Sequence, residues 1–280
     1  MRERSTDQII TAVEKMCVSA NCFLNDDIKS ALQRARQYER TDIARDMLCD
    51  ILKNANIAQT EQMPICQDTG MVIVLCKIGQ EVHISGGSLT DAINEGVRRG
   101  YMRNYLRLSV VGDPLRRENT GDNTPAVIYY DVVSGDTMEI TLMPKGFGSE
   151  NMSAVAMLKP SQGRQGVVDF VLETVKRGGS NPCPPIVVGV GIGGTMDKAA
   201  LLSKQALTRR VDSQHDDPYY AQMEQELLDQ INALDIGVQG FGGKTTALGV
   251  NIETFPTHIA GLPVAVTISC HVTRHAHVIL

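Results

Sequence analysis

The sequence predicts an α+β (mixed α/β) fold, with a helical N-terminal part packed on a β-containing body. In the first sixty residues, apolar side chains recur at three- and four-residue spacing, which is typical of amphipathic helices. From Pro64 onward, β-rich runs alternate with glycine-rich turns and intervening helices. This change divides the chain into a helical region, residues 1–62, and an α/β body, residues 63–280, which we expect to be one continuous domain.

The helical region is expected to contain three helices, at residues 6–20, 25–37 and 42–56. Ser5 or Thr6 would cap the first helix and Asp26 or Asp27 the second, because short polar side chains satisfy the free amides of a first turn. The charged residues between the apolar ones are typical of a solvated face. The region is therefore expected to be a scaffold or a partner surface.

In the body, β-branched runs predict strands and periodic apolar positions predict the helices between them. The expected strands are 71–78, 126–133, 137–143, 184–194 (ending in a glycine turn) and 262–269, and the expected helices are 89–106, 166–177, 195–207 and 218–234. Thr195 is expected to be an N-cap, and Pro218 suits a first helical position. A glycine-rich loop, 237–249, precedes the final strand, which leads to Cys270.

Composition and charge exclude several classes of function. The 280 residues include 32 acidic and 27 basic side chains, and this net charge of −5 is the reverse of what non-specific nucleic-acid binding needs. No stretch approaches the roughly 18 consecutive apolar residues of a membrane span. The N-terminal residues lack the apolar core of a signal peptide. We therefore expect a cytoplasmic protein that binds neither nucleic acid nor membrane.

The seven cysteines divide into two groups. Their odd number and wide spacing, in a chain without an export signal, argue against a disulfide framework. Four of them lie in periodic apolar segments and are expected to be core residues: Cys17, Cys22, Cys49 and Cys76. The other three lie in polar or proline-bounded segments, so they are the candidates for ligands or nucleophiles.

Each of these three cysteines has a distinctive local sequence. Cys66 stands beside Gln67 and Asp68 at the start of a strand, where a tight turn can bring the backbone close to a ligand, although such a turn can also carry a cysteine incidentally. Cys183 lies between prolines that stiffen its loop, and Cys270 follows an apolar strand. Their separations of 117 and 87 residues differ from compact Cys-x-x-Cys motifs. If they act together, the fold must bring them together.

Glycine-rich segments raise the alternative of a nucleotide-binding module. Gly189–Gly194 matches the pattern G-x-G-x-x-G between a strand and a helix, and Asp212 lies close to where a ribose-binding acid is expected. Gly237–Thr245 resembles a P-loop, but five residues instead of four separate its first glycine from Gly243. Nucleotide binding is therefore the non-enzymatic alternative.

Two further groups of side chains can be interpreted either as functional residues or as ordinary surface residues. Arg99, Arg103 and Arg107 are spaced four apart and would line one helix face, either as a clamp for a dianion or as a solvated cationic stripe. His271, His275 and His277 are either metal ligands or surface residues.

Taken together, four segments resemble the α subunit of the two-subunit, class I (iron–sulfur) fumarate hydratases and L-tartrate dehydratases. The segments are Ile65–Gly70, Lys145–Asn151, Asn181–Gly194 and Cys270. The resemblance implies that Cys66, Cys183 and Cys270 bind one [4Fe–4S] cluster and leave one iron open as a Lewis acid. It implies a hydro-lyase that catalyses the reversible hydration of fumarate to L-malate; L-tartrate dehydratase and mesaconate hydratase are the alternatives.

The resemblance also implies roles for individual residues. Gln67 and Asp68 would contact the substrate near the open iron, and Asp68 would exchange a proton with the departing hydroxyl. Arg107 would pair with a substrate carboxylate, and Gly148 would offer its backbone amide. The glycine turn at 189–194 would then be structural or would line the site.

Two positions depart from the family pattern. Phe147 stands where relatives usually have another glycine, and His271–His277 replaces a Trp- and Arg-containing segment.

The family also implies a partner for this chain. The sequence ends ten residues after Cys270, whereas single-chain relatives have a further domain that supplies the base and more carboxylate-binding cations. The resemblance therefore implies a separate β subunit that completes the active site, in an α2β2 heterotetramer. The chain alone is expected to hold a cluster but to have little hydratase activity.

Overall fold

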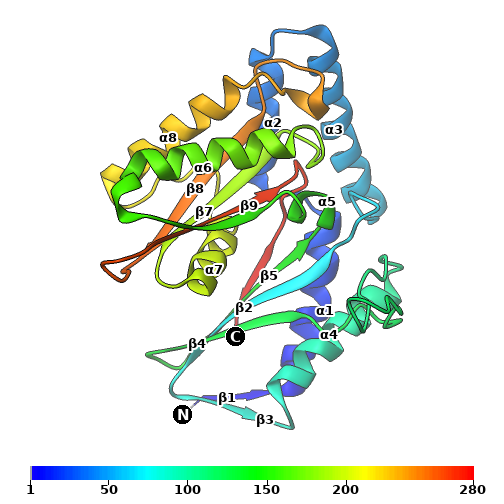
Figure 1. Cartoon of the computed structure of the whole chain (residues 1–280). Coiled ribbons are helices and arrows are strands. Elements are labelled where there is room, and N and C mark those ends of the chain that lie inside the picture. The colour runs from blue at the N-terminus through cyan, green and yellow to red at the C-terminus, as the bar shows by residue number, and fades with distance from the viewer. Residues whose placement is uncertain (1) are drawn as a thin grey trace. The chain divides into compact units, whose positions relative to one another are not determined.

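The computed structural model describes residues 2–280, which form two units (Figure 1). The first unit comprises residues 2–24, 55–147 and 274–280, and the second comprises 25–54 and 148–273. Both units contain helices and a mixed sheet, which confirms the predicted α+β fold. No helix within residues 2–280 is both long and apolar enough to cross a bilayer.

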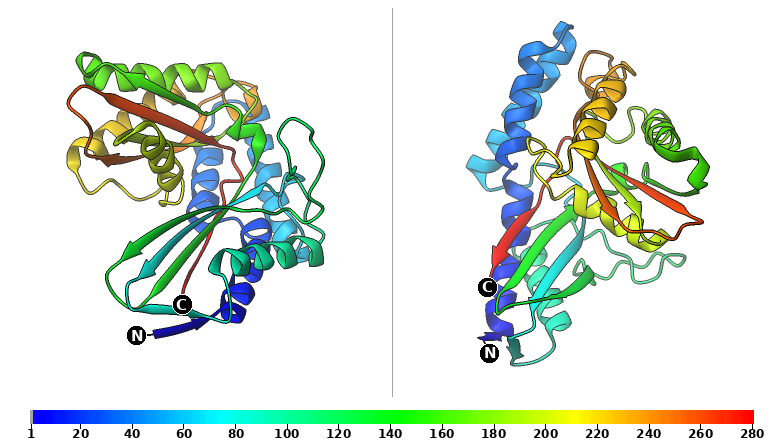
Figure 2. Two further views of the ribbon diagram at one scale, coloured as in Figure 1. Left: turned by 60° about the horizontal axis from the view of Figure 1, so that its bottom comes forward. Right: turned by 90° about the vertical axis from the view of Figure 1, so that its left-hand side faces the viewer.

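In the first unit, a four-stranded sheet has the order β10-β5-β2-β4, and β1 and β3 form a short parallel pair. The elements are β1 (Arg2–Ser5), α1 (Thr6–Cys22), β2 (Met71–Gly79), β3 (Val82–Ser85), α4 (Leu89–Arg103), β4 (Val127–Val133), β5 (Met138–Lys145) and β10 (Ala276–Ile279). β2 is antiparallel to β5 and parallel to β4, and β10 is antiparallel to β5. The last strand, β10, also runs alongside α1 (Figure 2).

The core of the first unit is formed by α1 and α4 together with β2 and β5. A Cβ on Gly96 would lie 2.6 Å from the Cβ of Val13, and one on Gly100 would lie 2.7 Å from the Cβ of Cys17, so glycines let the two helices approach closely. Ser5 caps α1, as expected, and forms a capping box with Gln8. Because α1 joins this core, it groups with strands from the centre of the chain.

In the second unit, the sheet has the order β6-β9-β7-β8, with helices on both faces. The elements are α2 (Asp26–Tyr38), β6 (Ala154–Leu158), α6 (Gly163–Gly178), β7 (Ile186–Gly193), α7 (Met196–Ala206), α8 (Pro218–Asn232), β8 (Ala247–Phe255) and β9 (Leu262–Ser269), together with parts of α3 (Asp42–Glu61) and α5 (Phe147–Glu150). β7 is antiparallel to β9 and parallel to β8, which it reaches through α7 and α8. Pro218 opens α8, as expected.

Alternate residues of β7 face different helices. A Cβ on Gly189 or Gly191 would lie 2.1 or 2.0 Å from a backbone carbonyl oxygen of α7, so these glycines let α7 cross the strand at close range. The residues between them, Val188, Val190 and Ile192, join the core formed with α6 and α8. The period of two along a strand therefore puts α7 on one face and α6 with α8 on the other (Figure 1).

The grouping of elements differs from the expected division into 1–62 and 63–280. α1 belongs to the first unit, whereas α2 packs near β8 in the second, so the helical region does not stay together. Side-chain periodicity identifies a helix but not the sheet that covers its apolar face. The helices themselves occur where they were expected.

Several local expectations were wrong. Strand β8 occupies residues for which a loop or nothing was expected, and β10 follows the strand that was expected to be last. The N-cap of α2 is Asn25 and not an aspartate, and it makes no side-chain capping bond. Thr195, in contrast, is the N-cap of α7, as expected, and its hydroxyl bonds to the carboxylate of Asp197.

Candidate functional site

In the first unit, strand pairing brings two of the family-like segments to one edge of the sheet. The loop containing Cys66 ends at Gly70 and enters β2, while the chain leaves β5 at Lys145. Met71 and Lys145 are paired in the antiparallel β2–β5 ladder, so the loops before β2 and after β5 lie together. Gly70 has a φ of +78°, and a Cβ there would lie 2.7 Å from the backbone nitrogen of Lys145, so only glycine fits.

The carboxylate of Asp68 ties these two loops to each other. Its Oδ1 accepts from the amide of Gly70 at 3.0 Å, and its Oδ2 accepts from the amide of Phe147 at 2.9 Å. A Cβ on Gly146 would lie 3.2 Å from Oδ2, so a small residue is favoured beside the carboxylate. Asp68 is half-buried, and each carboxylate oxygen keeps a second acceptor position. The side chain is therefore both fixed in place and able to accept a proton.

Three buried side chains hold the backbone of the same loop. Arg274 Nη2 donates to the Asp68 carbonyl at 2.6 Å, the Tyr101 hydroxyl donates to the Thr69 carbonyl at 2.6 Å, and Asn123 Nδ2 donates to the Gly70 carbonyl at 3.2 Å. Burial raises the pKa of Tyr101, so its hydroxyl stays protonated as a donor. Sequence reasoning did not find these three residues, because each is an isolated polar residue far along the chain from the loop that it supports.

Cys66, Gln67 and Arg107 lie on the same side of the first unit as Asp68. The Asp68 amide donates to Cys66 Sγ at 3.4 Å, and the thiol in turn lies 3.4 Å from Gln67 Oε1. The Thr69 hydroxyl donates to the carbonyl of Arg107 at 3.1 Å, and the Arg107 side chain is exposed. The first unit thus brings together four of the predicted site residues.

The expectation that three arginines share one helix face was wrong. Helix α4 ends at Arg103, so Arg107 lies beyond it in the following loop. Arg99 donates to Glu95 and Arg103 to Glu14, so these two arginines form ion pairs on the helices. Arg107, in contrast, forms no ion pair with any residue in 2–280. Its guanidinium is therefore available to an anion.

In the second unit, strand pairing likewise brings two cysteines to one edge. Cys183 precedes β7 and Cys270 follows β9, and the two strands are antiparallel, with Val187 opposite Ser269. The backbone amide and Nδ1 of His271 both contact the Cys183 carbonyl oxygen, at 3.4 and 2.9 Å. A carbonyl oxygen only accepts, so a hydrogen bond to it requires a proton on Nδ1, which also lies 3.3 Å from Gln239 Nε2. His271 therefore joins the two cysteine segments, a role that sequence reasoning missed.

The loop around Cys183 presents its thiol to solvent. Cys183 has φ +54, in the left-handed region that non-glycine residues rarely adopt, and its side chain is exposed. Gly148 lies beside this loop, since a Cβ on it would be 3.9 Å from the Asn181 carbonyl oxygen. The second unit therefore brings Gly148 next to the segment that holds Cys183.

The exposure of the cysteines separates candidate ligands from packing residues. Cys66 and Cys270 are half-buried and Cys183 is exposed, so all three thiols can reach a metal. Cys17, Cys22 and Cys76 are buried, and burial raises the pKa of Cys76 to about 12, so it remains a thiol. Because iron–sulfur clusters take thiolate ligands, this division fits the ligand set that the resemblance implies. Cys49 is half-buried on α3.

Among the described residues of each unit taken by itself, the histidines near the C-terminus belong to no group of metal ligands. Within neither unit, over residues 2–280, do three or more His, Cys, Asp or Glu side chains group closely enough to hold a metal ion. His271 is engaged with the Cys183 carbonyl, and His277 lies on β10 with its Nδ1 3.0 Å from the Thr141 hydroxyl.

Neither glycine-rich segment is arranged to bind a nucleotide. The backbone of α7 occupies the space next to Gly189 and Gly191, and both glycines lie inside β7 and not in a turn. Asp212, the expected ribose-binding acid, pairs with Arg210. The nucleotide-binding alternative is therefore not supported.

In the P-loop-like segment, a carboxylate of the chain itself takes the place of a bound anion. Glu39 Oε1 accepts from the amide of Lys244 at 2.6 Å, and Oε2 accepts from the amide of Thr245 at 3.1 Å. A Cβ on Gly243 would lie 2.7 Å from Oε1. Glu39 itself is buried. Gly243 therefore leaves room for the carboxylate of Glu39, which bonds to the amides that a phosphate would use in a P-loop.

This contact predicts a pH-dependent contribution to stability. Burial by itself would raise the pKa of Glu39, but the amides of Lys244, Arg40 and Thr245 outweigh it and the pKa is lowered from 4.5. The stabilisation is therefore full above about pH 4.5 and is lost as the pH falls through the lower folded-state pKa. Glu39→Gln is expected to reduce the free energy of unfolding by about 1–3 kcal/mol at pH 7, and this deficit should shrink in acid. Urea unfolding of Glu39→Gln and wild type, at pH 7 and in acid, measures this difference in the free energy of unfolding.

The matched control is Glu61→Gln, which changes an exposed glutamate at the end of α3. It should leave the unfolding curve almost unchanged. A Glu39→Gln curve that coincides with the wild-type curve at pH 7 would show that the carboxylate does not support the loop.

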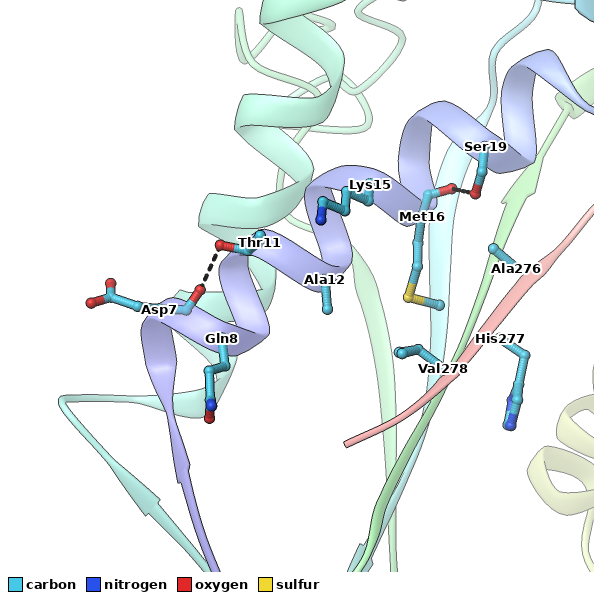
Figure 3. A pocket seen from close by; sticks show the side chains of 10 residues that line it. All are labelled: Asp7, Gln8, Thr11, Ala12, Lys15, Met16, Ser19, Ala276, His277 and Val278. Carbon is cyan, nitrogen blue, oxygen red and sulfur yellow. Dashed lines mark hydrogen bonds between the residues drawn. The ribbon is translucent and has the colours of Figure 1, made fainter.

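A hollow of about 660 Å³ in the first unit includes His277 among its lining residues (Figure 3). α1 and β10 line it, and none of Cys66, Gln67, Asp68 or Arg107 is among the lining residues. The hydroxyls of Thr11 and Ser19 donate to carbonyls of their own helix (Figure 3). These two hydroxyls therefore have hydrogen-bond partners within α1.

Comparison with known proteins identifies the family. Each unit carries an accessible cysteine at the end of a sheet strand, and in the first unit a fixed aspartate lies two residues from that cysteine. The model of the family described as fumarate hydratase (fumerase) matches residues 10–279. The chain therefore belongs to the fumarate hydratase family, a family of hydro-lyases.

Named relatives match over almost their whole length. A protein of Methanocaldococcus jannaschii, provisionally named L(+)-tartrate dehydratase subunit alpha, is 44% identical over 275 residues, which covers 96% of each chain. The L(+)-tartrate dehydratase subunit alpha of Escherichia coli strain UTI89 is 29% identical over 276 residues, which is 98% of this chain and 91% of that protein. The protein of the same name from strain K12 is 28% identical over 276 residues.

Proposed function

We propose that this chain is the α subunit of an iron–sulfur hydro-lyase that interconverts fumarate and L-malate, with a [4Fe–4S] cluster held by Cys66, Cys183 and Cys270. The observation that carries the proposal is the fixed carboxylate of Asp68, two residues from an accessible cysteine, in a loop whose Thr69 hydroxyl donates to the backbone carbonyl of Arg107. Membership of the fumarate hydratase family supports the reaction class.

When bound, the cluster would supply an open iron position that acts as a Lewis acid toward the substrate hydroxyl. Asp68 would exchange a proton with that hydroxyl, because backbone amides hold its carboxylate in one orientation while acceptor positions stay free. Arg107 would pair with a substrate carboxylate, since its guanidinium is exposed and matches carboxylate geometry. Gln67 would contact the substrate through its exposed amide, and Gly148 through its backbone N–H.

We propose further that a β subunit completes the active site in an α2β2 assembly. The relatives are named as alpha subunits, so a partner belongs with those proteins. Removal of a proton beside a carboxylate needs a base on the other side of the substrate. The β subunit would supply this base and additional cations for the second carboxylate.

L-Tartrate is the second candidate substrate, because the relatives cited carry the name tartrate dehydratase. Both substrates are dicarboxylates that lose a hydroxyl and a neighbouring proton, so the residues above would serve either one. We favour fumarate because the Gly148–Asn151 segment resembles the fumarase branch of the family.

Anaerobic assays of the cluster-loaded two-subunit enzyme on fumarate, L-malate, L-tartrate and mesaconate test the proposal. We expect fumarate and L-malate to be interconverted with the highest kcat/KM, and we expect little turnover by this chain alone. Preferred turnover of L-tartrate would establish the second candidate. Turnover of none of these acids by the loaded complex would refute the hydro-lyase assignment.

A further inference from the structure

Arg274 is a buried cation behind the loop that holds Cys66. Its side chain is 4% exposed, at the start of the segment that forms β10. Nη2 donates to the Asp68 carbonyl at 2.6 Å, whereas Nε is buried and has no hydrogen-bond acceptor among residues 2–280. An arginine is always charged, and a buried charge without compensation is costly. The position of Arg274 therefore requires an explanation beyond one hydrogen bond.

The protein groups around Arg274 do not balance its charge. No carboxylate of residues 2–280 forms an ion pair with it. Its electrostatic influence reaches the thiol of Cys22 and the hydroxyl of Tyr101, and burial raises the pKa of both groups, so both are neutral. The Asp68 carboxylate is turned toward the amides of Gly70 and Phe147. Among residues 2–280, the guanidinium therefore has no anionic partner.

We propose that Arg274 is a positioning residue whose fixed positive charge is balanced by the thiolate-bound cluster at Cys66. The inference rests on the proposed function. Cys66 is two residues from Asp68, whose carbonyl Arg274 holds, and its sulfur already accepts the Asp68 amide at 3.4 Å. A cysteine binds iron as a thiolate. The positive charge of Arg274 behind this loop therefore favours the cluster-loaded chain over the apo chain. Arg274 therefore couples cluster binding to the position of Asp68.

This role makes a prediction about the cluster that does not depend on catalysis. Arg274→Gln removes the charge but keeps a side-chain donor, and Arg274→Lys keeps the charge. Partners of metal ligands are typically worth about 10- to 100-fold in metal affinity. After anaerobic reconstitution of the full chain with iron and sulfide, Arg274→Gln is expected to lose iron to a chelator at least about tenfold faster than wild type. Arg274→Lys should recover most of the difference.

The thermal unfolding midpoint of the apo chain separates this role from a merely structural one. A residue that only supports the fold would lower the apo midpoint when replaced and leave the rate of iron loss unchanged. We expect Arg274→Gln to raise the apo midpoint, because it removes an uncompensated buried charge from the apo protein. We also expect it to lose iron faster than wild type. Arg103→Gln, which changes an exposed arginine on α4, is the matched control and should behave as wild type.

The outcomes distinguish this inference from the proposed function. If the wild-type chain takes up no cluster, the proposed function fails and the inference fails with it. If the wild-type chain takes up a cluster and Arg274→Gln retains iron equally well, only the inference is overturned. Faster iron loss in Arg274→Gln, with rescue by Arg274→Lys, supports both.

Discussion

Serine at position 66, 183 or 270 is expected to abolish both cluster binding and turnover. A serine hydroxyl does not ionise near neutral pH, so it does not replace a thiolate as an iron ligand. Lewis-acid catalysis is worth several kcal/mol, and each 1.4 kcal/mol is a factor of ten, so kcat should fall by at least about 10³-fold. Cys66→Ser, Cys183→Ser and Cys270→Ser should each lose the broad visible absorption of the cluster. Iron content and steady-state rates of the two-subunit enzyme measure both effects.

The control for these variants is Cys49→Ser, which changes a half-buried thiol on α3. It should keep both iron and activity. If Cys183→Ser retained full iron content and wild-type kcat, that cysteine would not be a ligand. A loss of iron in Cys49→Ser equal to that in Cys183→Ser would remove the distinction between the two groups of cysteines.

Asp68→Asn is expected to keep the cluster but lose most of the activity. Asparagine has nearly the same size and can still accept the Gly70 amide, but its amide group is a poor proton acceptor. Proton transfer by a positioned side chain typically contributes about 10²- to 10⁴-fold, so kcat should fall by about that factor, with a much smaller change in KM. Stopped assays on the loaded complex, together with its iron content, separate this loss from loss of the cluster.

Asp68→Asn also weakens one contact to the Phe147 amide, so a structural control is needed. Asp113→Asn provides it, because Asp113 Oδ1 accepts the amides of Leu115 and Arg116 in an exposed loop of the same unit. Asp113→Asn should affect stability slightly and kcat not at all. If Asp68→Asn had the wild-type kcat, a role of Asp68 in proton transfer would be ruled out.

Local pattern predicted most of the elements but not their grouping. Apolar periodicity identified α1, and alternating or continuous β-branched runs identified β2, β5 and β7. It did not predict that α1 packs with α4 and the first sheet, because the helix-to-helix contact depends on Gly96 and Gly100, far along the chain. β10 was missed because it is a short strand of four residues that forms only by pairing with β5.

For the site, the sequence predicted the residues at strand ends but not those that support them. Cys66 and Asp68 stand out because a polar segment interrupts an apolar pattern. Tyr101, Asn123 and Arg274 do not, because each contacts the loop across at least 31 residues of chain and has no local signal. The glycines of β7 were interpreted as a nucleotide-binding pattern or a turn, but Gly189 and Gly191 lie inside the strand, and the group beside them is α7.

The most direct test of the iron–sulfur assignment is the iron and acid-labile sulfide content of the full chain after anaerobic reconstitution. We expect about four irons and about four sulfides per chain, with broad visible absorption, and much lower values in a variant that combines Cys66→Ser, Cys183→Ser and Cys270→Ser. A colourless wild-type chain, or one whose iron content equals that of the triple variant, would contradict it.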